Sequence, residues 1–272
     1  MKAVGVRPRS HASLAVSATG KNWYLVNATP DVRHQVGTCA LLQPRAGTRE
    51  SPVRSVLLTD AELDHTIGLL ILREGSPLGV YASPAILAAL AQEFPVRRIL
   101  QPYTAFRWIE ANTNGEFVLD EDRLRVRAFQ LGTKRPRYAA ESAISGGWVL
   151  GYRFEDRQTR GVMVYAPGIE RWSADLAAQV DGTDCVFLDG TFWSDNEIEE
   201  AGVGCLTAKT AGHLPISGPG GSAEQFRSIS ARRRIYVHIN NTNPILDDNS
   251  PERRLLAESG LEVGWDGMEL EI

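Results

Sequence analysis

The chain has 272 residues, of which 43% are hydrophobic and 23% charged, and its net charge is −4. This composition supports a substantial core, in one large domain or two smaller ones, and excludes global disorder. The mild net charge argues against a nucleic-acid partner, and no apolar run approaches the length of a membrane span. Three scattered cysteines without a CxxC pair argue against a disulfide framework. We therefore expect a cytoplasmic protein with no membrane partner.

Short strand signals alternate with helix signals along the chain. The strand signals lie, in chain order, at residues 13–17, 23–27, 53–59, 79–82, 117–119, 124–129, 148–154, 162–165, 185–188 and 235–239. The helix signals lie at residues 64–73, 84–93, 173–180 and 251–259. The first two strand segments flank a short turn and predict a hairpin. The alternation predicts α/β sandwich layers rather than an all-α or all-β domain.

Two of the helix predictions depend on particular residues. Ser83 and Pro84 are typical of an N-cap and a first helical position, so they predict a helix start there. In the segment 64–73, helical spacing places Ile67, Leu70 and Ile71 on one face.

The most informative stretch follows the predicted strand at residues 53–59. Asp60, Glu62, Asp64 and His65 place three carboxylates and an imidazole within six positions. A spacing of two puts the three acids on one side wherever the backbone is extended. Carboxylate oxygens with imidazole suit iron, manganese or zinc better than a metal that prefers thiolates. The alternative interpretation is an acidic helix N-terminus, in which the carboxylates only complement the helix dipole.

A second candidate lies at the end of the predicted strand at residues 235–239. His238 runs there into an amide-rich loop that ends at Pro244. Polar residues at strand ends are where sites gather in α/β proteins. The alternative is a turn rich in asparagine with a structural histidine.

Two further candidates are His213 and Asp189. His213 follows Gly212 and precedes a glycine-rich stretch at residues 218–221, where the backbone can approach a ligand closely. Asp189 follows the predicted strand at residues 185–188. The alternatives are a flexible surface loop for His213 and a turn aspartate for Asp189.

The order of these four sites resembles that of the metallo-β-lactamase superfamily. There, a strand ends in a His-x-His-x-Asp-His motif, and later strand ends add an acid and histidines. In this chain the four motif positions hold Asp60, Glu62, Asp64 and His65. The replacement of both early histidines by acids resembles the pyrroloquinoline quinone (PQQ) biosynthesis protein B family. Other stretches that resemble this family lie at residues 7–17, 27–33, 64–70, 165–168, 189–191, 202–204, 218–221, 238–246 and 250–253.

The resemblance implies a fold. It covers about residues 7–272 and implies an α/β metallo-β-lactamase-like αββα sandwich, with residues 1–272 as a single domain. Family members usually begin with a strand, a glycine-rich loop and a CxCxxC zinc-binding segment, and this chain starts after them. An uncovered sheet edge there implies marginal stability or oligomerisation.

The resemblance also implies a function and a set of site residues. The family acts in making PQQ, and its proposed reaction is the iron- and oxygen-dependent hydroxylation of the tyrosine ring in a cross-linked Glu–Tyr precursor. The implied cofactor is iron(II), with zinc as the second candidate, and the implied partners are this small peptide-derived substrate and other proteins of the PQQ pathway. The implied metal ligands are Glu62, Asp64, His65 and His238, and the implied catalytic residues are His213 and Asp189.

Two other classes of function compete with the hydroxylase, which is an oxidoreductase. One is a metal-dependent hydrolase, as in most of the superfamily. The other is a binding or carrier protein that holds or transports PQQ or its precursor.

Overall fold

The computed structural model of the protein describes residues 9–48, 50–103, 105–113 and 115–272. Contacts within the chain divide these residues into two units. The N-terminal unit consists of residues 10–160, and the C-terminal unit consists of residues 161–272 with residue 9. The single domain over residues 1–272 therefore stays a prediction.

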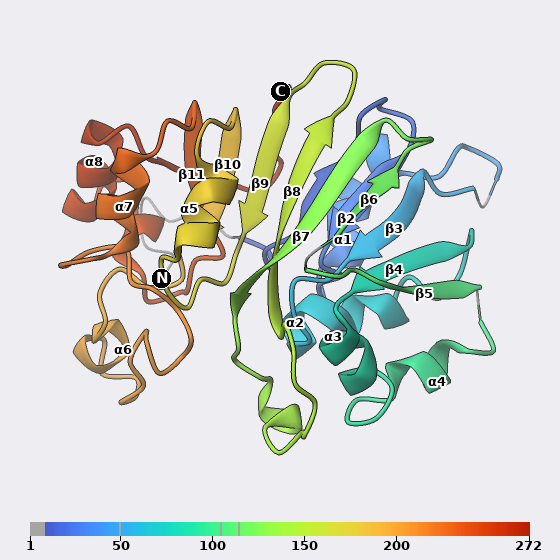
Figure 1. Ribbon diagram of the computed structural model, residues 1–272, viewed down its shortest axis with the longest axis horizontal. Helices are drawn as coiled ribbons and strands as arrows, with labels where there is room; N and C mark the ends of the chain where they lie inside the picture. The colour runs from blue at the N-terminus through green and yellow to red at the C-terminus, as the bar shows by residue number, and fades with distance from the viewer. Residues whose placement is uncertain (1–8, 49, 104, 114) are drawn as a thin grey trace. The chain divides into compact units, whose positions relative to one another are not determined.

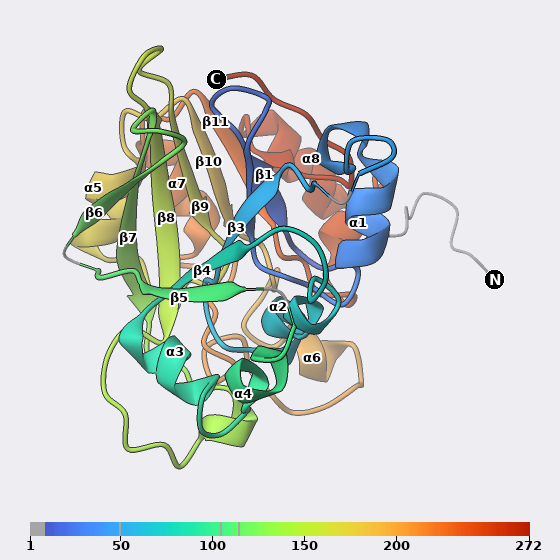
Figure 2. The same cartoon turned by 90° about the vertical axis from the view of Figure 1, so that its right-hand side faces the viewer.

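In the N-terminal unit, a sheet has the strand order β1-β2-β3-β4-β5 (Figures 1 and 2). β1 is antiparallel to β2, and β2 to β5 are parallel. The strands β6, β7 and β8 of this unit pair in antiparallel fashion in that order. The bounds are β1 Leu14–Val16, β2 Trp23–Val26, β3 Val53–Leu57, β4 Leu78–Ala82, β5 Phe106–Glu110, β6 Glu116–Leu119, β7 Leu124–Gly132 and β8 Val149–Asp156.

The helices of the N-terminal unit are short. They are α1 Val32–Thr38, α2 Leu63–Thr66, α3 Pro84–Ala89 and α4 Val96–Leu100, with 3-10 turns η1 Ala40–Leu42, η2 Ile67–Leu70 and η3 Arg137–Ala139. Both views place α2, α3 and α4 beside the β4–β5 side of the sheet (Figures 1 and 2). The predicted N-cap is confirmed, because the Ser83 hydroxyl accepts a hydrogen bond from the Ile86 amide at 3.2 Å.

In the C-terminal unit, four parallel strands pair in the order β9-β10-β11-β12, and Figure 1 shows β9, β10 and β11 side by side. The bounds of the elements are β9 Val162–Ala166, α5 Ala174–Val180, β10 Cys185–Asp189, α6 Glu197–Glu200, α7 Ser222–Ser228, β11 Arg233–Val237, η4 Pro244–Leu246, α8 Pro251–Glu258 and β12 Glu262–Val263. The helices α5 and α8 begin after serine N-caps, Ser173 and Ser250.

The central parallel strands are buried, as their continuous apolar runs predict. Val56 and Leu57 of β3, Val80 of β4, and Val186 and Leu188 of β10 are fully buried. Runs that are apolar on both faces are typical of strands covered by helices or another sheet. Each unit therefore has its own core, and polar residues begin where these strands end.

Two sequence predictions need correction. The helix predicted over residues 64–73 is α2, which changes to the 3-10 turn η2 at Ile67, and Ile67 and Ile71 are 36% and 40% exposed rather than part of a buried face. The reason is that the turn at Gly68 is fixed by a main-chain contact with Ala28. The strand predicted over residues 235–239 ends at Val237, so His238 lies in the following loop.

Within the described ranges, no helix is long and apolar enough to cross a membrane.

Candidate metal centre

The first group of candidate residues follows β3 in the N-terminal unit, and its centre is a buried pair. Nδ1 of His65 lies 2.7 Å from Oδ2 of Asp60 and 2.8 Å from Oδ1. Asp60 is 7% exposed and His65 is 4% exposed. Burial alone raises the pKa of Asp60, but the charge and hydrogen bond of His65 outweigh it and lower this pKa to about 2. Burial alone lowers the pKa of His65, but the charge and hydrogen bond of Asp60 outweigh it and raise this pKa to about 9.

The end of β2 holds this segment in place. The main-chain amide and the hydroxyl of Thr59 both donate to Oδ1 of Asn27, at 2.9 and 3.0 Å. Asn27 is fully buried and has a φ of 67°, a conformation that asparagine tolerates better than most residues. Next to it, Ala28 accepts a hydrogen bond from the Gly68 amide and donates one to the His65 carbonyl. The backbone that carries His65 is therefore tied on both sides to the neighbouring strand end.

Glu62 and Asp64 flank the pair differently from Asp60. Glu62 precedes α2, and its amide donates to Oδ1 of Asp60 at 2.9 Å. Asp64 is within α2, and both side chains are half-buried. Burial, followed by the charge of Asp60, raises the pKa of Glu62. The condition under which the three acids would share one side is not met at Asp64, because the extended backbone ends at Glu62 and Asp64 lies in α2.

Asp189, in the C-terminal unit, has the same relationship to His213. Asp189 ends β10 and is 1% exposed, and its Oδ2 lies 2.7 Å from Nδ1 of His213. The amide of Ile169 also donates to Oδ2, at 3.0 Å. Burial raises the pKa of Asp189, but the charge and hydrogen bond of His213 outweigh it, and the pKa is held below its ordinary range. An ionised carboxylate only accepts, so Nδ1 of His213 carries the proton of this bond.

Thr191 connects Asp189 to His238. Its hydroxyl donates to Oδ1 of Asp189 at 2.5 Å and lies 2.7 Å from Nδ1 of His238. Because that hydroxyl proton is directed at the carboxylate, Nδ1 of His238 donates to the hydroxyl oxygen. His238 has a φ of 55°, and its ring stacks on that of His213 with centroids 5.5 Å apart.

Two buried side chains tie together the loops that carry these residues. Asn243 donates to the Gly190 carbonyl at 2.8 Å. Glu197 accepts from the Trp193 amide at 2.5 Å and also from the Thr242 hydroxyl. Glu197 is 5% exposed, and its pKa is raised by burial. The strained backbone at His238 is thus held by the loop that follows β10.

The structure brings some of the candidate residues together. Asp189 is the last residue of β10, His238 follows the parallel strand β11, and His213 joins them from a separate loop. One donor atom from each of Asp189, His213 and His238 lies within 4.8 Å of the others, a spacing compatible with a metal ion. Glu62, Asp64 and His65 lie together in the N-terminal unit.

The sequence interpretation missed the role of Asp60 in orienting His65. It also missed the roles of Thr191 and Glu197. The only signal for Asp60 was its position five residues before His65, and for Thr191 its position two residues after Asp189.

The donor set suits a metal. Carboxylates hold Nδ1 of His65 and of His213, which fixes each ring and directs Nε2 away from the carboxylate. This is how histidine ligands of protein metal sites are usually oriented. Oxygen and imidazole donors without thiolate suit iron, manganese or zinc. In the C-terminal unit, Asp189, His213 and His238 therefore fit a divalent metal.

Comparison with known proteins first gives the class. The profile described as "Beta-lactamase superfamily domain" matches residues 22–239, so the chain belongs to the β-lactamase superfamily. The α/β fold class, the metallo-β-lactamase-like αββα sandwich, is thereby confirmed, as it is by the solved structure described next.

The relatives then give the family. Coenzyme PQQ synthesis protein B of Pseudomonas putida is 38% identical over 97% of this chain and 88% of its own length. That of Cupriavidus necator is 40% identical over 99% of this chain and 90% of its own. The crystal structure of Zn(2+)-bound PqqB from Methylobacterium extorquens superposes with a TM-score of 0.91, at 35% identity, over 99% of this chain and 90% of that one. The chain belongs to the coenzyme PQQ synthesis protein B family.

Proposed function

We propose that this protein is a non-haem iron-dependent oxygenase of PQQ biosynthesis, which hydroxylates the tyrosine ring of a cross-linked Glu–Tyr precursor. The observation that carries the proposal is the pair of carboxylate-held histidines, Asp60 with His65 and Asp189 with His213, in a chain of this family. Such rings are fixed before a metal or substrate arrives, which is what a metal-dependent reaction needs.

The proposed metal ligands are Glu62, Asp64, His65 and His238. A mixed set of carboxylates and imidazoles resembles non-haem iron(II) sites, which keep positions open for oxygen. Iron, when bound, supplies the activation of dioxygen that ring hydroxylation requires. Replacing two histidines of the superfamily motif by Asp60 and Glu62 lowers the number of nitrogen donors, which disfavours a di-zinc hydrolase centre.

In this proposal, the residues around the metal position groups and move a proton. Asp60 fixes the His65 ring, and Thr191 fixes the tautomer of His238. His213 accepts the phenolic proton of the substrate at Nε2, because its Nδ1 already donates to Asp189. Asp189, whose oxygens are engaged by His213, Thr191 and Ile169, contributes to catalysis by positioning His213.

The setting proposed for this reaction follows from the family. The substrate is small and peptide-derived, and it comes from other proteins of the PQQ pathway. We place the reaction in the cytoplasm, in line with the thiol state of the three cysteines.

A metal-dependent hydrolase is the second candidate. The observation that favours it is the zinc named for the Methylobacterium extorquens structure, because zinc is the usual metal of superfamily hydrolases. A carrier of PQQ or of its precursor, with a site that does no chemistry, is the third.

The experiment that tests the proposal measures oxygen consumption. Metal-free protein is loaded under anaerobic conditions with iron(II), with zinc, or with no metal. Each sample is then mixed with the cross-linked precursor, dissolved oxygen and ascorbate, which supplies the two electrons that reduce the second oxygen atom to water. The proposal predicts oxygen uptake stoichiometric with precursor in the iron sample only. Hydrolysis in the zinc sample supports the second candidate, and tight precursor binding with no reaction in any sample supports the third.

A further inference from the structure

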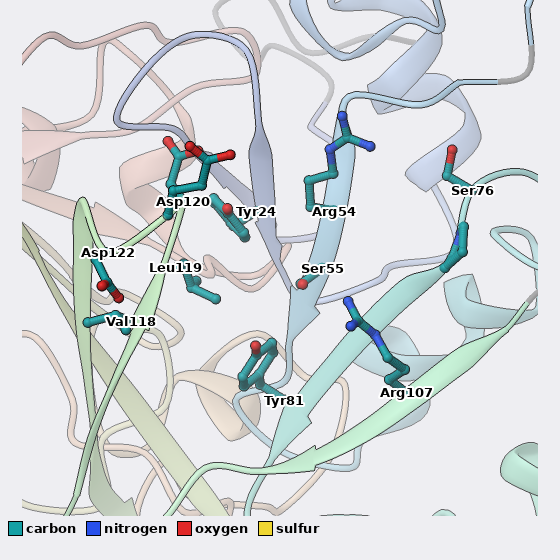
Figure 3. A pocket seen from close by; sticks show the side chains of 12 residues that line it. Tyr24, Arg54, Ser55, Ser76, Tyr81, Arg107, Val118, Leu119, Asp120 and Asp122 are labelled. Atoms are coloured by element: carbon teal, nitrogen blue, oxygen red, sulfur yellow. The ribbon is translucent and has the colours of Figure 1, made fainter.

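A cavity of about 500 Å³ lies within the N-terminal unit (Figure 3). Residues from β2, β3, β4 and the turn between β6 and β7 line it. Its volume is in the range of pockets that hold small molecules. None of the candidate metal ligands in this unit, Glu62, Asp64 or His65, is among its lining residues.

One wall of the cavity carries two guanidinium groups. Arg54 and Arg107 lie on this wall in Figure 3, at the starts of β3 and β5. Nε of Arg54 donates to Oδ1 of Asn22 at 2.8 Å, which leaves its terminal nitrogens for another acceptor. Arg107 has no hydrogen-bond partner in the described part of the chain. This wall favours an anion.

The opposite wall carries three consecutive acids in an unusual backbone conformation. Asp120, Glu121 and Asp122 have φ angles of 56°, 54° and 70°, a region that costs non-glycine residues energy. Asp120 accepts from Asn22 at 2.7 Å and from Thr19 at 3.0 Å. The carboxylates of Glu121 and Asp122 have no such partner among the described residues, and both side chains are exposed. This wall favours a cation.

Asn22 fixes the separation of the two walls. The same side-chain amide accepts from Arg54 and donates to Asp120. The positive and negative walls are therefore held in place through one residue before any ligand arrives, which reduces the entropy that binding must overcome.

The floor between the walls presents hydroxyl groups. Ser55 is 4% exposed, has no hydrogen-bond partner among the described residues, and directs its hydroxyl into the cavity in Figure 3. Tyr24 is also 4% exposed, and burial followed by the charge of Asp120 raises its pKa to about 12. Burial raises the pKa of Tyr81, whose ring stacks on Phe117. A hydroxyl that opens into the cavity and has no protein partner is available to bond a group of a ligand.

We propose that this cavity binds a short zwitterionic peptide, whose carboxylate contacts Arg54 and Arg107 and whose ammonium group contacts Glu121 and Asp122. The peptide backbone or a polar side chain satisfies Ser55, and the rings of Tyr24 and Tyr81 supply apolar surface for an aromatic side chain. A dianion is disfavoured by the acidic wall and a dication by the basic wall, because each leaves one wall opposite a like charge. The proposal does not depend on the metal chemistry.

The test uses L-alanyl-L-tyrosine as the probe, with calorimetric titration of the full chain in the presence of a chelator. Chelation keeps the probe's carboxylate from binding a metal. Two analogues each lack one charge: N-acetyl-L-alanyl-L-tyrosine has no ammonium group, and L-alanyl-L-tyrosinamide has no carboxylate. We expect the parent dipeptide to bind with a micromolar to millimolar Kd, and each analogue to bind about tenfold more weakly or worse.

The protein variants assign each charge to a wall. Arg107→Gln should weaken binding of the parent dipeptide at least about tenfold and leave binding of the amide analogue unchanged. Asp122→Asn should weaken binding of the parent dipeptide and leave binding of the acetylated analogue unchanged. Ser55→Ala should weaken the binding of the parent dipeptide and of both analogues. Arg98→Gln, on an exposed arginine that does not line this cavity, should change nothing. All variants should keep the melting temperature of the wild type, apart from a small change for Ser55→Ala.

Three results would overturn the proposal. The first is the absence of binding at millimolar probe. The second is equal binding of the parent and both analogues. The third is binding that Arg107→Gln and Asp122→Asn leave unchanged.

Discussion

Asp60 holds His65 by a contact of 2.7 Å between Oδ2 and Nδ1, and both side chains are buried. The sequence placed Asp60 at a motif position that is a metal ligand elsewhere in the superfamily. Its contacts make it instead the carboxylate that orients His65, a proposed metal ligand. Asp189 and His213 repeat this arrangement in the C-terminal unit.

Replacing Asp60 by asparagine should weaken metal binding about 10- to 100-fold, because the His65 ring loses the charged acceptor that fixes it. Competitive titration with a fluorescent zinc chelator measures this effect. Asp31→Asn is the matched control, since Asp31 holds His11 through the same 2.7 Å contact at an exposed position. Equal affinity of Asp60→Asn and wild type, with the fold intact, would show that Asp60 has no orienting role.

Thr191→Val should lower both stability and metal affinity. The variant keeps the shape of the side chain but leaves Oδ1 of Asp189 and Nδ1 of His238 without their shared partner. We expect a loss of about 1–3 kcal/mol in the free energy of unfolding, measured by urea denaturation of metal-free protein. Thr210→Val should cost much less stability, because Thr210 is exposed and its hydroxyl contacts only Thr207. A cost no greater than that of Thr210→Val contradicts the bridging role.

His213→Ala should lower the rate of hydroxylation by about 10²- to 10⁴-fold, which is what a positioned general base contributes. Iron content should stay near that of the wild type. His213→Gln should not restore the rate, because an amide keeps a hydrogen bond to Asp189 but cannot take the proton. Single-turnover rates and iron occupancy are measured on the same preparation. Loss of iron together with activity would make His213 a metal ligand, and full activity would reject both roles.

Gly68→Ala should destabilise the N-terminal unit by about 3 kcal/mol, since an added Cβ would lie 2.3 Å from the Thr29 carbonyl oxygen and 2.6 Å from the Ala28 main chain. The backbone must shift to relieve this contact, and Ala28 also bonds to the His65 carbonyl. Thermal unfolding measures the loss. Gly37→Ala in α1 is the control, because a Cβ there meets no atom within 4 Å and helix propensity favours alanine. If both variants melt like the wild type, the close packing at Gly68 carries no cost.

The strand ends that carry the site could be predicted from the sequence, because β3, β10 and β11 are apolar runs followed at once by polar residues. The serine N-caps were equally predictable, since capping is a local interaction. The strand β5 was missed because its residues are only partly buried and show no clear alternation.

The detailed roles of the site residues were less predictable. Whether Asp60 binds a metal or orients His65 depends on a turn that its own carboxylate makes with the Glu62 amide. The Thr191 bridge depends on the pairing of two strands 47 residues apart in sequence. The cavity walls depend on Asn22, which contacts Arg54, 32 positions away in sequence, and Asp120, 98 positions away. Such contacts arise from tertiary structure, and no local pattern encodes them.

The proposed reaction is tested most directly by the fate of the oxygen atom. Iron(II)-loaded protein is incubated with the cross-linked Glu–Tyr precursor and ascorbate, the source of the two electrons that reduction of the second oxygen atom requires, under isotopically labelled dioxygen. The product is examined by mass spectrometry. The account predicts a product that carries labelled oxygen on the tyrosine ring, formed with iron and absent with zinc. A product that takes its oxygen from water, or an unchanged precursor in the presence of bound iron, would contradict it.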